Sequence, residues 1–129
     1  MSGPTAPARK TVLVVEDDPT VRAMIVRALG SRCTVHQAKD GMEALELITR
    51  IDPQPSLLIL DIMMPRVDGL SLARKLKADP NLRVIPIIFL TAKTGSSDMV
   101  EGIQAGAKHY LTKPFSISAL LEKVDKLLQ

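Results

Sequence analysis

Carboxylates follow two strongly apolar runs of the sequence. Asp61 comes directly after the run at residues 57–60, and Glu16, Asp17 and Asp18 follow the run at residues 12–15. A lone buried carboxylate is costly or stays protonated, so such a placement indicates either chemistry or a solvated strand end. If these carboxylates meet, they require a cation among them, and carboxylates, a carbonyl and waters are the ligands that Mg²⁺ prefers.

A hydroxyl group and an ammonium group occupy comparable places later in the chain. Thr91 follows an apolar run at residues 85–90, and Lys113 comes shortly after the run at 109–111. Together with Mg²⁺, these groups suit a phosphoryl group, whose oxygens need neutralising donors during transfer. Asp61 is then the natural nucleophile, because a carboxylate can form an acyl phosphate when a metal offsets the charge repulsion.

The elements that must position these groups alternate regularly. We expect strands at residues 12–15, 35–38, 57–60, 85–90 and 109–111, separated by segments whose apolar residues recur at helical spacing. Helix boundaries are marked by Asp18-Pro19, Gly30, Asp68-Gly69, Pro80 and Gly106. The alternation predicts a doubly wound α/β fold, a five-stranded parallel sheet with five helices on its two faces. Ligands bind such sheets beyond the carboxyl ends of the strands, where the polar groups fall.

Composition favours one cytoplasmic domain. Of the 129 residues, 46% are hydrophobic and 2% aromatic, which is enough for one aliphatic core. Cys33 is the single cysteine and has no internal disulfide partner. No stretch resembles a secretory signal or a membrane span. We expect residues 1–10 to be a disordered lead-in, residues 11–129 to form the domain, and the protein to be cytoplasmic without membrane insertion.

The charge pattern argues against direct nucleic-acid binding. The net charge is only +3, and the nearest basic cluster, Arg74, Lys75 and Lys77, fits an ordinary solvated helix face.

Four segments in a fixed order resemble the receiver domain of bacterial two-component response regulators. They are VLVVEDDPTVR, LLILDIMMPRVDG, IIFLTAK and HYLTKPF, and the resemblance runs from about Lys10 to the C-terminus. It implies a flavodoxin-like fold of strand order 2-1-3-4-5 with five helices in three layers. It also implies a signalling module, similar to single-domain chemotaxis regulators, that is not an enzyme beyond its own phosphotransfer and dephosphorylation.

The resemblance assigns a phosphoacceptor and its metal ligands. Asp61 takes the position of the phosphoacceptor. Mg²⁺ would be held by Asp61, by Asp17 directly, by Glu16 mainly through water, and by the backbone carbonyl of Met63. Asp18 lies one place beyond the acidic pair, and we interpret it as a helix cap.

The resemblance also assigns the switch residues. Thr91 and Lys113 would close on the phosphoryl oxygens, and the movement of Thr91 would let Tyr110 turn inward. The family has a cis peptide bond before the proline at Pro114, so we expect one here.

The implied partners lie on both sides of this switch. A phosphohistidine on a sensor kinase or on a phosphotransfer protein would donate to Asp61. A downstream protein would then read the face made by the fourth helix, the fifth strand and the fifth helix. Met63 and Lys93 are poorly suited to orienting an attacking water, so we predict slow self-dephosphorylation.

Rival interpretations remain at this point. Asp61 alone would fit a solvated strand end, and residues 16–18 alone would fit a capping cluster beside Pro19. A flavodoxin-like cofactor binder would need a phosphate-binding loop where this chain has three acids. An aspartate-nucleophile phosphatase would need a second carboxylate soon after Asp61 and a cap, which the chain lacks. A receiver that acts without phosphorylation is the third alternative.

Overall fold

The structure is a computed structural model of the chain, and it describes residues 9–62, 69–91 and 109–128. Its elements, in chain order, are β1 (Lys10–Val15), α1 (Pro19–Leu29), β2 (Cys33–Ala38), α2 (Gly41–Ile48), β3 (Leu57–Asp61), α3 (Gly69–Lys77), β4 (Ile87–Thr91), β5 (His109–Thr112) and α5 (Ile117–Leu128). The described residues therefore contain four helices. The segment between β4 and β5, where the sequence predicts a further helix, lies outside them.

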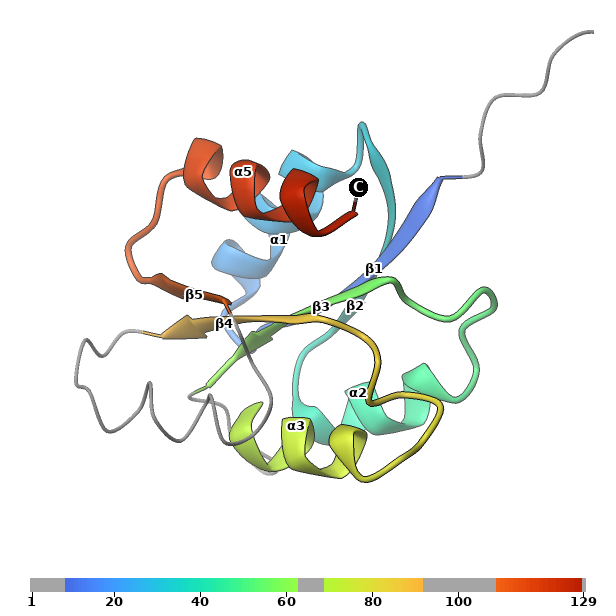
Figure 1. The fold of residues 1–129 in the computed structure, drawn as a ribbon. Helices are drawn as coiled ribbons and strands as arrows, with labels where there is room; N and C mark the ends of the chain where they lie inside the picture. Colours follow the sequence, from blue (N-terminus) through green and yellow to red (C-terminus); the bar gives the residue numbers. More distant parts are fainter. Residues whose placement is uncertain (1–8, 63–68, 92–108, 129) are drawn as a thin grey trace, which may run out of the picture.

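The five strands form one parallel sheet in the order β2-β1-β3-β4-β5. Helices α1 and α5 cover one face of the sheet, and α2 and α3 cover the other (Figure 1). The predicted doubly wound α/β fold is confirmed, including its strand order. Because all strands are parallel, their carboxyl ends lie along a single edge.

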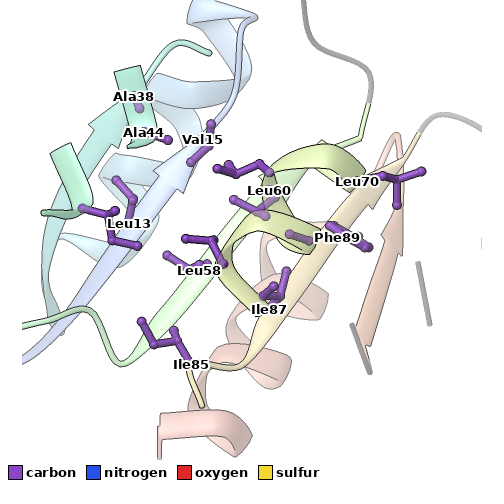
Figure 2. Close-up of a cluster of buried hydrophobic side chains, with 14 of the residues drawn as sticks. Leu13, Val15, Ala38, Ala44, Leu58, Leu60, Leu70, Ile85, Ile87 and Phe89 are labelled. Carbon is purple, nitrogen blue, oxygen red and sulfur yellow. The ribbon is translucent and has the colours of Figure 1, made fainter. Parts of the chain in front are cut away.

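Two apolar clusters hold the layers together. Alternate residues of a strand point to opposite faces of the sheet, so Val12 and Val14 pack toward α1 and α5, whereas Leu13 and Val15 pack toward α2 and α3. The cluster that contains Leu13 and Val15 also contains Phe89, which is fully buried (Figure 2). The central strand β3 is buried along its whole length, which agrees with its uninterrupted apolar sequence.

Two strand boundaries differ from the predicted ones. Strand β2 begins at Cys33, two residues earlier than expected, because an edge strand can carry an exposed polar residue such as Thr34. Strand β4 begins at Ile87, two residues later than expected. Pro86 has no N–H for the sheet ladder, although its carbonyl still accepts a bond from Leu58 N at 3.0 Å.

The first two helices begin at capping residues. Asp18 accepts hydrogen bonds from Thr20 N and Val21 N, and Pro19 takes the first helical position, as the sequence predicts. At the start of α2, Asp40 accepts from Glu43 N at 2.8 Å while Glu43 accepts from Lys39 N at 3.1 Å. This reciprocal pair is a capping arrangement that our sequence analysis missed.

The remaining sequence predictions concern the ends of helices, the cysteine, the start of the domain and membrane-spanning segments. Helix α1 ends at Gly30, as expected, whereas Gly106 and Asp68 lie outside the described residues. Cys33 is a buried free thiol. Arg9, the first described residue, donates to the carbonyl oxygen of Cys33 at 2.8 Å, and β1 begins at Lys10, one residue before the predicted start of the domain. In the described residues no helix is both long enough and apolar enough to cross a membrane.

Candidate functional site

The polar groups singled out in the sequence lie together at the carboxyl edge of the sheet. Asp61 is the last residue of β3, Thr91 is the last residue of β4, and Glu16 directly follows β1. The exposed fractions of their surfaces are 3% for Asp61, 2% for Thr91 and 0% for Glu16. Asp61 is therefore a buried carboxylate, and the interpretation as a solvated strand end is wrong.

Three carboxylates meet closely enough to share a metal ion. One carboxylate oxygen from each of Glu16, Asp17 and Asp61 lies within 4.8 Å of the others. Glu16 and Asp61 are buried and Asp17 is exposed, so the group opens to solvent on one side. Metal–oxygen distances of about 2.0–2.1 Å for Mg²⁺ would let such a group bind it partly directly and partly through water.

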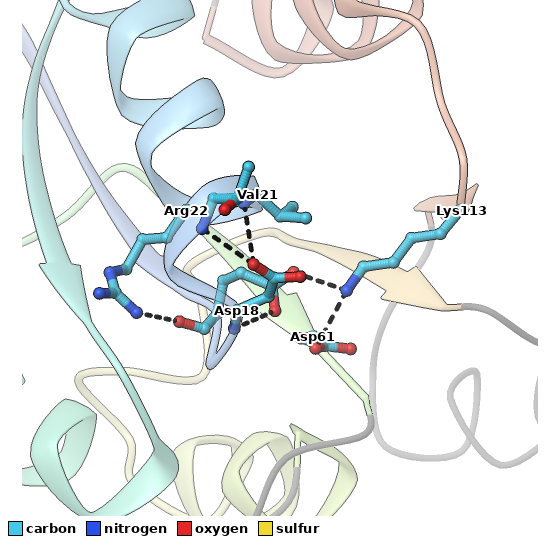
Figure 3. Close-up of polar contacts among 7 residues, drawn as sticks. Asp18, Val21, Arg22, Asp61 and Lys113 are labelled. Atoms are coloured by element: carbon cyan, nitrogen blue, oxygen red, sulfur yellow. Dashed lines mark hydrogen bonds and ion pairs between the residues drawn. The ribbon is translucent and has the colours of Figure 1, made fainter.

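Lys113 is the cation of the group. Its Nζ atom lies 2.7 Å from Glu16 Oε1 and 3.2 Å from Asp61 Oδ2 (Figure 3). The contact with Glu16 is an ion pair outside hydrogen-bond geometry, so this fully buried oxygen accepts no hydrogen bond from the part of the chain that the structure describes. An oxygen in that position is suited to a further ligand, and a metal-bound water is one that fits.

The electrostatics of the group favour additional positive charge. Burial, followed by contact with the Glu16 carboxylate, raises the pKa of Asp61 to about 7, although Lys113 acts in the opposite direction. For Lys113, burial lowers the pKa, but the contacts with Glu16 and Asp61 outweigh it and the net pKa is raised. One ammonium group therefore does not compensate for the two buried carboxylates, and a divalent cation would favour the ionised form of Asp61.

The acidic residues after β1 have different local roles. Glu16 N donates to the Ala38 carbonyl at 3.1 Å, and Glu16 Oε2 accepts from Asp18 N at 3.1 Å. The side chain of Asp18 caps α1, which confirms its predicted role, and it does not belong to the metal-binding group. Asp17 lies between these anchored residues with its carboxylate close to that of Asp61.

Comparisons with known proteins agree with this arrangement. Residues 12–125 match the response regulator receiver domain. The chain belongs to this family. Response regulator MprA of Mycobacterium ulcerans (strain Agy99) is 44% identical over 119 residues, which cover 92% of this chain and 50% of that protein. The chain thus spans about half the length of the curated relatives it matches.

Solved structures show the same fold. A response regulator structure from Chloroflexus aurantiacus J-10-fl has a TM-score of 0.86 at 36% identity, covering 94% of this chain and 98% of that one. The chemotaxis protein CheY4 of Vibrio cholerae also has a TM-score of 0.86, at 29% identity, covering 93% and 99%. Receiver domains are phosphorylation-activated switches of two-component systems, and histidine kinases supply their phosphoryl groups. This chain is such a domain.

The residues that the resemblance assigns to the switch lie at the end of β4, on β5 and directly after β5. The carbonyl oxygen of Thr91 accepts a bond from Lys113 N at 2.7 Å, which ties the end of β4 to the residue after β5. Tyr110 is half-buried on β5, and its ring centroid lies 5.8 Å from that of Phe89 at an interplanar angle of 50°. The predicted cis peptide bond between Lys113 and Pro114 is confirmed.

Two residues assigned from the sequence cannot be placed, and two others were missed. Met63 and Lys93 lie outside the described residues of this receiver domain, so their roles stay predictions. The close packing of Gly69 against Asp61 was missed, although a glycine at the first position of a helix was its visible signal. Arg22, which contacts the backbone of Glu16, was also missed, and no spacing pattern marks it.

Proposed function

We propose that this receiver domain accepts a phosphoryl group on Asp61 from a phosphohistidine donor in a Mg²⁺-dependent reaction. The observation that supports this proposal is the meeting of Glu16, Asp17 and Asp61, with Lys113 Nζ 3.2 Å from Asp61. Such a site has a buried nucleophile, oxygen ligands for a divalent cation and a positive charge for the phosphoryl oxygens.

The proposed metal ligands are Asp17, Asp61, the backbone carbonyl of Met63 and, through water, Glu16. When bound, Mg²⁺ would supply positive charge that neutralises the carboxylates and the phosphoryl oxygens. Glu16 is anchored through its backbone N–H and through both oxygens of its carboxylate, so the residues that follow are held in place. The group is therefore preorganised for oxygen ligation.

The transfer step needs Asp61 in its ionised form. A carboxylate oxygen of Asp61 forms a bond to phosphorus while the P–N bond of the donor breaks, and the electron pair returns to the imidazole nitrogen of the donor. Lys113 and the hydroxyl of Thr91 then contact the phosphoryl oxygens. Lys113 already lies beside Asp61, so only a small rearrangement is required of it.

Thr91 and Tyr110 connect phosphorylation of Asp61 to the binding of a partner. When Thr91 contacts the phosphoryl group, Tyr110 turns inward and the face formed by the fourth helix, β5 and α5 changes shape. A downstream protein binds that face. The size of the response is limited by how much better the phosphoryl group fits the active state than the inactive one.

The remaining parts of the proposal concern the molecule as a whole. The receiver domain comprises β1, which begins at Lys10, and the elements that follow it. The domain is a cytoplasmic signalling module that is not an enzyme for external substrates, and it does not itself bind nucleic acid. Because Met63 and Lys93, two positions past Asp61 and Thr91 in the sequence, are poorly suited to orienting an attacking water, its self-dephosphorylation is slow. A time course of the phosphorylated protein in Mg²⁺ checks this last statement, and decay within seconds would contradict it.

Intact-mass spectrometry tests the phosphorylation itself. The protein is incubated with Mg²⁺ and acetyl phosphate, alongside Asp61→Asn and a sample with a chelator. Asp18→Asn is a matched control, because it removes a nearby carboxylate that only caps α1. We expect one added phosphoryl group in the wild type and in Asp18→Asn, and none in the other two samples. An adduct that persists in Asp61→Asn would contradict the assignment, as would no adduct in the wild type when short-lived species are trapped.

A further inference from the structure

We propose that Arg22 is a positioning residue that sets the affinity of the site for a divalent cation. The inference rests on the proposed function, because it concerns the same metal site. Arg22 Nη1 donates to the carbonyl oxygen of Glu16 at 2.8 Å, and Arg22 Nε donates to Gln37 Oε1 at 3.2 Å. Figure 3 shows Asp18 between the guanidinium group of Arg22 on one side and Lys113 on the other.

The first contact fixes the backbone that carries the metal ligands. The carbonyl group of Glu16 and the N–H of Asp17 belong to one planar peptide unit. Holding the carbonyl oxygen therefore holds the plane of that unit and the direction in which the chain enters Asp17. The N–H of Glu16 is already bonded to the Ala38 carbonyl at 3.1 Å. With Arg22 bonded to the carbonyl oxygen, both backbone polar groups of Glu16 are held by hydrogen bonds.

The second contact makes Arg22 a rigid connection between three elements. Its backbone N–H donates to the Asp18 carbonyl at 2.9 Å, so the residue is anchored in the first turn of α1. Its side chain reaches the end of β1 through Glu16 and reaches β2 through Gln37. A planar guanidinium group can serve both acceptors with little loss of freedom, whereas a lysine ammonium group cannot reproduce the fork.

Charge alone would produce the opposite effect. A cation near the acidic group repels a metal ion, so a residue that acted only through its charge would weaken binding, and its removal would tighten it. A residue that positions the ligands strengthens binding, and its removal loosens it. The sign of the change in metal affinity therefore separates these two roles.

The test measures the Mg²⁺ dissociation constant by isothermal titration calorimetry, with the metal alone and no phosphodonor. Arg22→Ala is compared with Arg27→Ala, which removes the same charge from the exposed last turn of the same helix. We expect roughly a tenfold weaker affinity for Arg22→Ala, as is typical when a residue that supports metal ligands is lost. Arg27→Ala should bind as the wild type does. Unchanged or tighter binding by folded Arg22→Ala would overturn the inference.

Two milder variants keep the inference testable if Arg22→Ala does not fold, which circular dichroism reports. Arg22→Lys keeps the charge, and we expect it to bind Mg²⁺ about threefold more weakly than the wild type, since it loses the fork. Gln37→Ala should weaken binding in the same direction by less. Wild-type affinity in both would overturn the inference. Absence of Mg²⁺ binding by the wild type would overturn the proposed function as well, so the two failures are distinguishable.

Discussion

Gly69, the first residue of α3, packs directly against the backbone carbonyl of Asp61. A Cβ atom at position 69 would overlap the carbonyl oxygen of Asp61 and lie 3.0 Å from Ile62 Cα. The backbone N–H of Gly69 also donates to the Ile62 carbonyl at 3.2 Å. The start of α3 is therefore seated on the end of β3 with no room for a side chain, and the position of Asp61 depends on this contact.

Substitution of Gly69 by alanine is expected to disturb both stability and chemistry. The added methyl group must move either α3 or the backbone of Asp61, and overpacking of this kind typically costs about 1–3 kcal/mol. Urea unfolding measures the free-energy change, and the rate of adduct formation with acetyl phosphate measures the effect on Asp61. The matched control is Gly30→Ala, because Gly30 ends α1 with right-handed backbone angles, and a Cβ there would make a tight contact of 3.2 Å with the Val26 carbonyl oxygen but would not overlap it. Equal stability of the two variants would contradict this interpretation.

Asp61→Asn should stabilise the metal-free protein above neutral pH. The pKa of Asp61 is raised from 3.8 to about 7, first by burial and then by Glu16. As the pH rises through this window, the unfolded chain releases the proton before the folded protein does, so wild-type stability falls. The variant lacks this loss, and at about pH 8 its free energy of unfolding should exceed that of the wild type by roughly 1–3 kcal/mol.

Urea unfolding in a chelator, at several pH values between about 4 and 8, checks the expected difference. The advantage of Asp61→Asn should shrink toward the acid end of this window, where wild-type Asp61 is protonated in the folded protein. Asp125→Asn is a control for the loss of a carboxylate, because Asp125 is exposed and pairs with Arg32 at 2.6 Å. A difference between Asp61→Asn and the wild type that does not vary with pH would exclude the raised pKa as its cause.

Lys113→Gln should make the stability of the protein strongly dependent on Mg²⁺. The substitution leaves Glu16 and Asp61 facing each other without the ammonium group that lies within 3.2 Å of both. In a chelator we expect a loss of roughly 2 kcal/mol, less than for a fully buried pair because the Lys113 side chain is 23% exposed. Added Mg²⁺ should restore more stability to the variant than it adds to the wild type.

Thermal unfolding with and without Mg²⁺ measures this difference, and Lys126→Gln serves as the control. Lys126 is an exposed residue in the last turn of α5, so its loss changes the net charge by the same amount away from the site. If Lys113→Gln and Lys126→Gln respond equally to Mg²⁺, then Lys113 does not compensate for the carboxylates.

Residue types and periodicity were enough to predict the class of fold and the edge of the sheet that carries the site. Apolar runs that alternate with helical periodicity require parallel strands, and the carboxyl ends of parallel strands share one edge. Asp61, Thr91 and the acidic residues after β1 could therefore be assigned to one place without coordinates. The strand order came from the resemblance to receiver domains, since periodicity alone does not specify which strands are neighbours.

The roles of these groups depend on how the elements pack against one another. The tertiary structure buried Asp61, which could otherwise have been a solvated strand end, and it separated the capping carboxylate of Asp18 from the metal-binding group. It placed Lys113 between Glu16 and Asp61, although Lys113 is 52 residues from Asp61 along the chain. Local patterns carry information about residues a few positions apart, whereas burial, pKa and the fit of Gly69 depend on distances between elements that packing sets.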